Sequence, residues 1–274
     1  MNQKLKFESP TFIQRLKGML GVDFYRLFHT PLFYIFLAIA AIIPAMILGM
    51  TGIPNPETNE VIKLYTNTWQ VIAADTPLYV VNDIAEYANM NMVFIFGGIM
   101  VSIFIGHDYK SGYVKQLFTT HAKKQDYMLS KTISCAFAMA CMCITYLLGT
   151  VTAGLLTQTS FTVNIGSLII AIISKMIMSL GWASLYTFLN IIFRKYFGIS
   201  IASSFFFGTG ILIIGAGAIF NNSSILNIFL YGSSVYACLS SSITTLLVCT
   251  IISIGWTVIY NILGTGILSN TDVY

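Results

Sequence analysis

Long apolar segments separated by polar loops dominate the pattern of hydrophobic and polar positions along the chain. A transmembrane helix needs about 20 mostly apolar residues. The segments approach or reach that length and are continuous, whereas the strands of a membrane barrel alternate over roughly 10 residues. The sequence therefore predicts an all-α membrane protein with a single transmembrane domain over residues 1–274. Its six transmembrane helices are expected at about residues 31–51, 90–106, 132–156, 167–193, 197–220 and 241–263.

The polar segments at either side of these helices add two expectations. Residues 83–89 can begin a helix that leads into the second transmembrane segment. Residues 221–240 contain an apolar run, ILNIFLYG, that is far too short to span a bilayer. Such a run is typical of a re-entrant or interfacial segment. The alternative is a loop that packs over the bundle.

The N-terminal segment, residues 11–29, is amphipathic at the helical period. Asp23 also belongs to this segment, and Arg15 and Arg26 are expected roughly opposite its apolar face. A basic amphipathic helix next to a transmembrane helix is expected to lie in the membrane interface. It is either an anchor to anionic lipid or a connecting helix that transmits motion from a cytoplasmic partner. The apolar face consists of Ile13, Leu16, Leu20, Phe24 and Leu27.

The loop between the second and third transmembrane segments, residues 107–131, is too long for a tight turn. Its residues 111–119 can form a short helix, with Gly112 as a break or pivot at the start. A helix with an apolar ridge and basic flanks suits a groove on a partner protein. An ordinary basic loop explains the lysines but not the ridge. The proposed docking residues are Ser111, Gly112, Val114, Lys115, Leu117 and Phe118, of which Val114, Leu117 and Phe118 form the ridge.

Composition and charge support this picture and fix an orientation. The chain is 56% hydrophobic and only 9% charged, against about 25% charged residues in soluble domains. This excludes a soluble enzyme, a nucleic-acid-binding domain and a disordered tail. Most of the 14 Lys and Arg residues fall in the N-terminal segment and in alternate loops. Because Lys and Arg concentrate on the cytoplasmic side of membrane proteins, both termini are expected in the cytoplasm.

Sequence motifs for catalysis are absent from the chain. It contains no GxxxxGK[ST] loop that would hold nucleotide phosphates, so ATP hydrolysis is not expected in this chain. Its 5 cysteines show no CxxC spacing, and neither a metal site nor a cofactor is expected. Lys175, inside the fourth apolar segment, is the one clear intramembrane charge. Its ammonium group either reaches the outer interface along its stem or faces a subunit interface or substrate cavity.

Three short segments carry a resemblance to a known family. They are Asp-Phe-Tyr-Arg-Leu-Phe at 23–28, Asp-Tyr-Lys-Ser-Gly at 108–112 and Tyr-Met-Leu-Ser-Lys at 127–131. Together they resemble the permease subunits of bacterial type-two ABC exporters, which have six transmembrane helices with both termini inside. The short chain, the long first external loop and the Tyr- and Phe-rich helices most resemble permeases that protect bacteria against their own lantibiotics or bacteriocins.

The resemblance implies a half-transporter in the bacterial cytoplasmic membrane. Two permease subunits, identical or different, would pair in the lipid bilayer, and two ABC ATP-binding subunits that hold ATP and Mg would dock on them. Residues 111–119 would be the coupling helix and residues 11–29 the connecting helix. The substrate would be an amphipathic peptide or a lipid-like molecule. The alternatives are a non-transporting sensor or assembly protein with a cytoplasmic partner, and an ATP-independent carrier.

Overall fold

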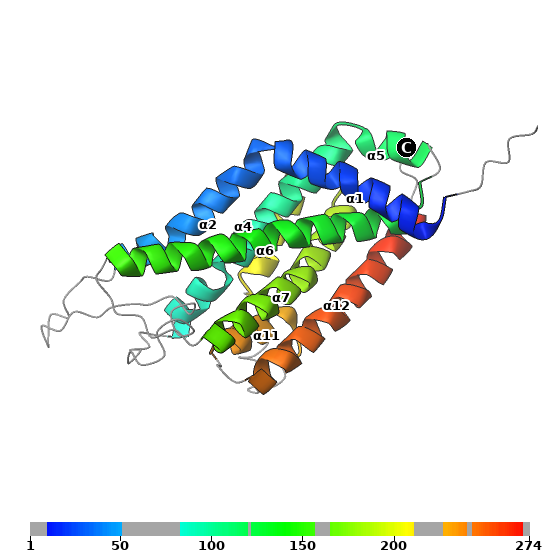
Figure 1. The fold of residues 1–274 in the computed structure, drawn as a ribbon. Coiled ribbons are helices and arrows are strands. Elements are labelled where there is room, and N and C mark those ends of the chain that lie inside the picture. Colours follow the sequence, from blue (N-terminus) through cyan, green and yellow to red (C-terminus); the bar gives the residue numbers. More distant parts are fainter. Residues whose placement is uncertain are drawn as a thin grey trace, which may run out of the picture.

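The computed structural model describes residues 10–50, 83–119, 122–156, 165–210, 227–239 and 243–270. Within these ranges every regular element is an α-helix, and the longer helices pack side by side as a bundle (Figure 1). The helices are α1 (Phe12–His29), α2 (Pro31–Met50), α4 (Asp83–Lys110), α5 (Tyr113–Thr119), α6 (Lys124–Leu156), α7 (Ile165–Ile192), α8 (Phe197–Gly208), α11 (Leu230–Leu239) and α12 (Ile243–Asn270).

The long helices have the length and apolar character of membrane-spanning segments. Among the described residues, α4, α6, α7 and α12 meet both conditions. A bent pair, α1 with the first part of α2, meets them together and would be a fifth span, with 65° between its two helices. The all-α fold is therefore confirmed, and four to five of the described helices are long and apolar enough to cross a membrane.

Several helices begin or end away from the predicted boundaries. The helix α4 begins at Asp83, as residues 83–89 indicated, and continues to Lys110, beyond the predicted end at 106. The helix α6 begins at Lys124 rather than 132. Gly112, with a φ of 76°, separates α4 from α5, which confirms the predicted pivot. Helices thus run past the apolar segments into the polar end of the bundle.

The predicted continuous helix over residues 197–220 is wrong. The helix α8 ends at Gly208 after 12 residues, and Gly210 follows with a φ of 67°. This left-handed conformation favours glycine and terminates a helix. A Cβ atom at Gly210 would also lie 2.1 Å from the ring of Tyr231, so the close approach of α11 requires the glycine. Residues 211–226 lie outside the described residues, as do residues 51–82 and 157–164.

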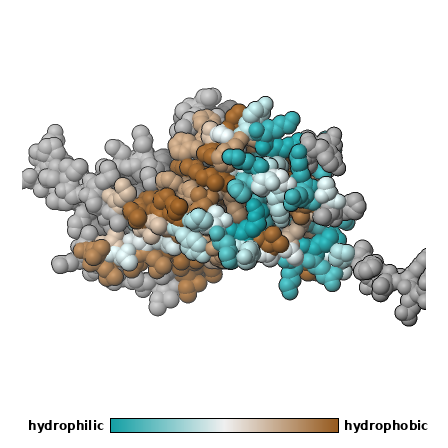
Figure 2. All heavy atoms as spheres, turned by 90° about the horizontal axis from the view of Figure 1, so that it is seen from above, coloured by the Kyte–Doolittle hydropathy of each residue, from teal (hydrophilic) through white to brown (hydrophobic). Residues whose placement is uncertain are grey.

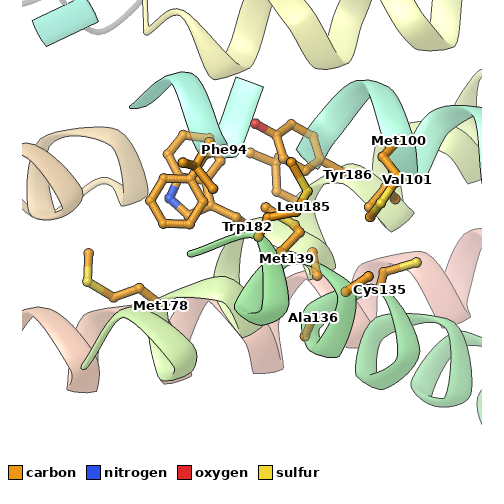
Figure 3. Packing of buried hydrophobic residues seen from close by; sticks show 14 of the residues in the cluster. Phe94, Met100, Val101, Cys135, Ala136, Met139, Met178, Trp182, Leu185 and Tyr186 are labelled. Carbon is orange, nitrogen blue, oxygen red and sulfur yellow. The ribbon is translucent and has the colours of Figure 1, made fainter. Parts of the chain in front are cut away.

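Aromatic rings fill the centre of the bundle. The ring of Trp182 in α7 stacks on Phe94 of α4, at 5.3 Å between centroids, and on Tyr186 one turn further along α7 (Figure 3). Two glycines make room for Tyr186, because a Cβ atom at Gly98 or Gly208 would lie 2.7 Å or 2.9 Å from its side chain. The bundle centre therefore depends on close helix contacts at small residues, as in many membrane proteins.

A polar seam joins α4, α7 and α8 inside this bundle. The amide Nδ2 of Asn190 donates to Ser102 Oγ at 3.1 Å, and Ser102 and Ser204 share a hydrogen bond of 2.7 Å. Asn190 Oδ1 accepts from Ser200 Oγ. All four side chains are buried. These bonds satisfy polar groups that no water reaches.

Candidate functional site

A buried cluster of four charged side chains joins the second half of α1 to the end of α4 and the start of α6. It lies toward the end of the bundle where α5 and the end of α12 meet (Figure 1). We call this the α5 end. Lys131 Nζ of α6 lies 2.5 Å from Asp23 Oδ1 of α1 and 2.6 Å from Asp108 Oδ2 of α4. Arg26 of α1 pairs with the other oxygen of Asp108. The ion cluster of Asp23, Arg26, Asp108 and Lys131 therefore ties three helices together with no net charge.

The charged groups of the ion cluster are almost completely buried, so each needs partners within the protein. Lys131 and Asp108 are 0% exposed and Asp23 is 2% exposed. A buried ion needs both an opposite charge and further hydrogen bonds. Asp23 Oδ2 accepts from Ser130 Oγ at 2.6 Å, and Asp108 Oδ2 accepts from the Tyr127 hydroxyl at 3.5 Å. The carboxylates thus have partners beyond the two cations.

Two aromatic rings flank the cations. Arg26 Cζ lies 4.5 Å from the ring centroid of Tyr113, and Lys131 Nζ lies 4.8 Å from that of Phe104. Such contacts attract a cation to the face of the ring. Burial, followed by the charge of Asp23, raises the pKa of Tyr113, so the ring remains neutral. Because Tyr113 is the first residue of α5, these contacts attach α5 to the ion cluster.

A second ion pair holds the start of α1 against α6. Arg15 Nε donates to Asp126 Oδ2 at 2.7 Å, and Asp126 is buried. The local sequence supports the position of Arg15, because Thr11 and Gln14 form a capping box that begins α1. Arg15 and Arg26 were predicted to point away from the apolar face of α1. Both side chains nonetheless pair with carboxylates on neighbouring helices, Arg15 with Asp126 and Arg26 with Asp108.

The predicted apolar face of α1 only partly faces the bundle. Leu27 is buried, and Leu16, Leu20 and Phe24 are half-buried, but Ile13 is 73% exposed. Asp23 lies on the inner side beside Leu27 because its carboxylate is bound by Lys131 and Ser130. The inner face of α1 is therefore a mixture of apolar side chains and paired charges.

The apolar ridge of α5 faces inward, which corrects the expectation that it is exposed to a partner. Val114 is 1% exposed and packs in a cluster with Tyr127, Met128, Ile191 and Leu268. Leu117 and Phe118 are half-buried against the same cluster. The exposed side of α5 carries Ser111, just before the helix, together with Lys115, Gln116 and Thr119, and Gly112 is half-buried. The ridge therefore connects α5 to the ends of α6, α7 and α12.

A groove of about 670 Å³ opens between α1, α5 and the start of α6. Its volume lies within the usual range of binding pockets. Gly18 lines it on α1, and a Cβ atom there would meet nothing within 4 Å. The described lining residues are Pro10, Gln14, Arg15, Gly18, Met19, Val22, Tyr113, Leu117, Ala122, Lys123 and Asp126. We call this the α1–α5 groove.

The exposed charge around the groove is positive. At the α5 end, the described aspartates, Asp23, Asp108 and Asp126, are all buried in ion pairs. Figure 2 shows hydrophilic side chains gathered toward this end and hydrophobic side chains over the middle of the molecule. The described end thus offers a basic surface to an acidic partner. The exposed lysines are Lys17, Lys110, Lys115, Lys123 and Lys195.

Lys175 lies away from this end, in the half of α7 nearer its start. It is half-exposed, and its carbonyl oxygen accepts from Ser179 Oγ at 2.8 Å. The structure does not bring it together with the ion cluster or the α1–α5 groove. Within the part of the chain that the structure describes, no group of His, Cys, Asp or Glu residues could hold a metal ion.

Asp108 and Lys131 lie in the sequence segments that carry the resemblance, but the sequence did not predict them as site residues. Asp126 and Tyr113 were also missed. One signal was available, because the chain has only 10 Asp and Glu residues and three aspartates fall within its basic segments. A carboxylate among lysines at the end of an apolar segment indicates a buried ion pair.

Comparison of the chain with protein-family models and with curated proteins finds no match.

Proposed function

We propose that this protein is the permease subunit of an ATP-driven ABC exporter. One observation carries the proposal. The three segments that carry the resemblance, residues 23–28, 108–112 and 127–131, come together in and around one buried ion cluster. Separate motifs that meet in space support a shared role, and a role in force transmission suits their position between α1, α5 and the long helices.

In this proposal α5 is the coupling helix and α1 the connecting helix. The ATP-binding subunit docks on the exposed side of α5 and in the α1–α5 groove, while Val114 carries displacement to α6, α7 and α12. The ion cluster makes α1 move with α4 and α6, because separating them would leave buried charges unpaired. ATP and Mg are bound by the partner, and two permease subunits pair in the bacterial cytoplasmic membrane.

The membrane topology is part of the proposal. Among the described helices, α2, α4, α6, α7 and α12 would cross the membrane and α8 would enter it, with α1 in the interface and both termini in the cytoplasm. The middle of α11 lies level with the middle of α7, because Trp182 Nε1 donates to Ser234 Oγ at 2.8 Å. This depth supports a re-entrant segment before α12. The substrate would be an amphipathic peptide or lipid-like molecule, in self-protection or export.

Copurification tests the proposal. The permease is coexpressed with the ABC ATP-binding subunits of its source organism, beginning with any that a neighbouring gene encodes, and binding and ATP hydrolysis are measured in detergent and in vesicles. We expect Lys115→Glu with Gln116→Glu, and separately Gly18→Phe in the groove, to abolish binding. Lys195→Glu changes an exposed lysine outside the groove and is the matched control.

The outcomes separate the alternatives. Binding by both variants at the wild-type level would contradict docking at α5 and the groove. Binding of a partner that has no ATPase activity would instead favour the non-transporting docking protein. Transport by the permease alone would favour the ATP-independent carrier.

A further inference from the structure

A second cavity, of about 220 Å³, lies between α7, α8, α11 and α12, away from the α5 end. Seven of its ten described lining residues are aromatic. Trp256 forms one wall, stacked between Phe229 and Tyr260 at centroid distances of 6.0 Å and 5.2 Å. Trp182 lies on the opposite helix, α7. The cavity is thus an aromatic slot rather than a polar site.

The N–H groups of the two indole rings both donate hydrogen bonds within the protein. Trp182 Nε1 donates to Ser234 Oγ at 2.8 Å, and Trp256 Nε1 donates to the Ile228 carbonyl at 2.8 Å. A water molecule needs two to four polar partners, and an apolar cavity of about 150 Å³ stays dry and accepts hydrocarbon. The volume is below the roughly 300 Å³ at which pockets for whole drug-sized ligands begin. The slot therefore suits one segment of a hydrocarbon chain.

The slot lies at a depth where hydrocarbon surrounds the protein. Trp256 is near the centre of α12, which at 28 residues is longer than the hydrocarbon core of a bilayer. Phe206 and Phe229, which line the slot, are each 40% exposed. Exposed aromatic side chains at this depth face lipid chains, so the slot opens toward a source of its ligand.

We propose that this slot binds one acyl chain of a membrane lipid, which enters beside Phe206 and Phe229 and lies against the rings of Trp182 and Trp256. The site is independent of ATPase docking and of the proposed transport activity. It requires only that α7, α8, α11 and α12 pack as described within a bilayer.

Quenching of tryptophan fluorescence by brominated lipid tests the site. The full chain carrying Trp69→Phe and Trp256→Phe keeps Trp182 as its sole tryptophan and is placed in phosphatidylcholine vesicles with or without bromine at the middle of the acyl chains. Trp182 is 1% exposed, so lipid outside the bundle does not touch it. We expect its emission to fall by about half or more in brominated vesicles, because bromine quenches an indole on contact.

Two variants of this protein distinguish the slot from the outer surface. Leu185→Phe fills the slot and should abolish the quenching. Ile251→Phe adds the same side chain at a position of α12 that is 67% exposed and should leave the quenching unchanged. Leu230→Phe is the second filling variant if Leu185→Phe does not fold.

Three results would overturn the proposal. Equal emission in the two kinds of vesicle would mean that no lipid chain enters, as when a second copy of the protein covers the slot. Equal quenching in both filling variants would mean that bromine reaches Trp182 by another route. Quenching by a water-soluble agent such as iodide would mean that the slot holds water.

Discussion

Replacing Lys131 by methionine should destabilise the protein more than any neutral substitution at the α5 end. Lys131 binds two carboxylates that are at most 2% exposed. After Lys131→Met, Asp108 keeps Arg26, but Asp23 keeps only the Ser130 hydroxyl. Removing one partner of a buried ion pair costs about 3–5 kcal/mol. We expect a loss in the free energy of unfolding within that range.

A double-mutant cycle separates the charge from the shape of the side chain. Asp23→Asn alone leaves an excess positive charge, whereas Asp23→Asn with Lys131→Met leaves the balanced pair of Asp108 and Arg26. The double variant should therefore be more stable than the sum of the single losses predicts, with a coupling energy of about 2 kcal/mol or more. Unfolding is followed by circular dichroism as sodium dodecyl sulfate is added to protein in mild detergent. Additive losses, or a Lys131→Met variant of wild-type stability, would refute the reasoning.

Three further predictions use the same unfolding assay. Val114→Asp should lower the free energy of unfolding by about 3 kcal/mol or more, because it buries an unpaired charge. Lys115→Asp, on the exposed side of α5, should change that free energy little. Similar losses in the two variants would contradict the inward orientation of the ridge. Gly98→Ala should lower the free energy of unfolding by about 1–3 kcal/mol through overpacking against Tyr186. Gly255→Ala should be tolerated, because a Cβ atom there meets nothing within 4 Å. A tolerated Gly98→Ala would count against the described packing. Asn190→Leu should cost about 0.6 kcal/mol, the average measured for hydrogen bonds between membrane helices, and at most about 1.7 kcal/mol. An unchanged stability would count against the polar seam.

Hydrophobic patterning predicted the parts of the fold that depend on local composition. The long helices, the helix at residues 113–119 and the pivot at Gly112 follow from apolar length, period and a glycine at a break. The end of α8 at Gly208 does not, because Gly210 lies in an apolar run that could equally continue a helix. The ring of Tyr231, which is 21 positions away in sequence, approaches so closely that only a glycine fits there.

The candidate site was predictable in its segments but not in its contacts. The amphipathic pattern identified α1 and α5, yet it gave Arg15 and Arg26 no partner and assigned Val114 to a partner protein. Helical period gives the face of a residue, but it does not say what lies against that face. Only the fold places Asp108 and Asp126, from α4 and α6, within reach of those two arginines.

Stimulated ATP hydrolysis tests the central claim most directly. The ABC ATP-binding subunit that copurifies with the permease is isolated, and its ATPase rate is measured with and without the permease in lipid vesicles. The account predicts that wild-type permease binds the subunit and raises its ATPase rate, and that the variant with Lys115→Glu and Gln116→Glu does neither. An ATPase rate that is unchanged by the wild-type permease, or raised equally by the variant, would contradict it.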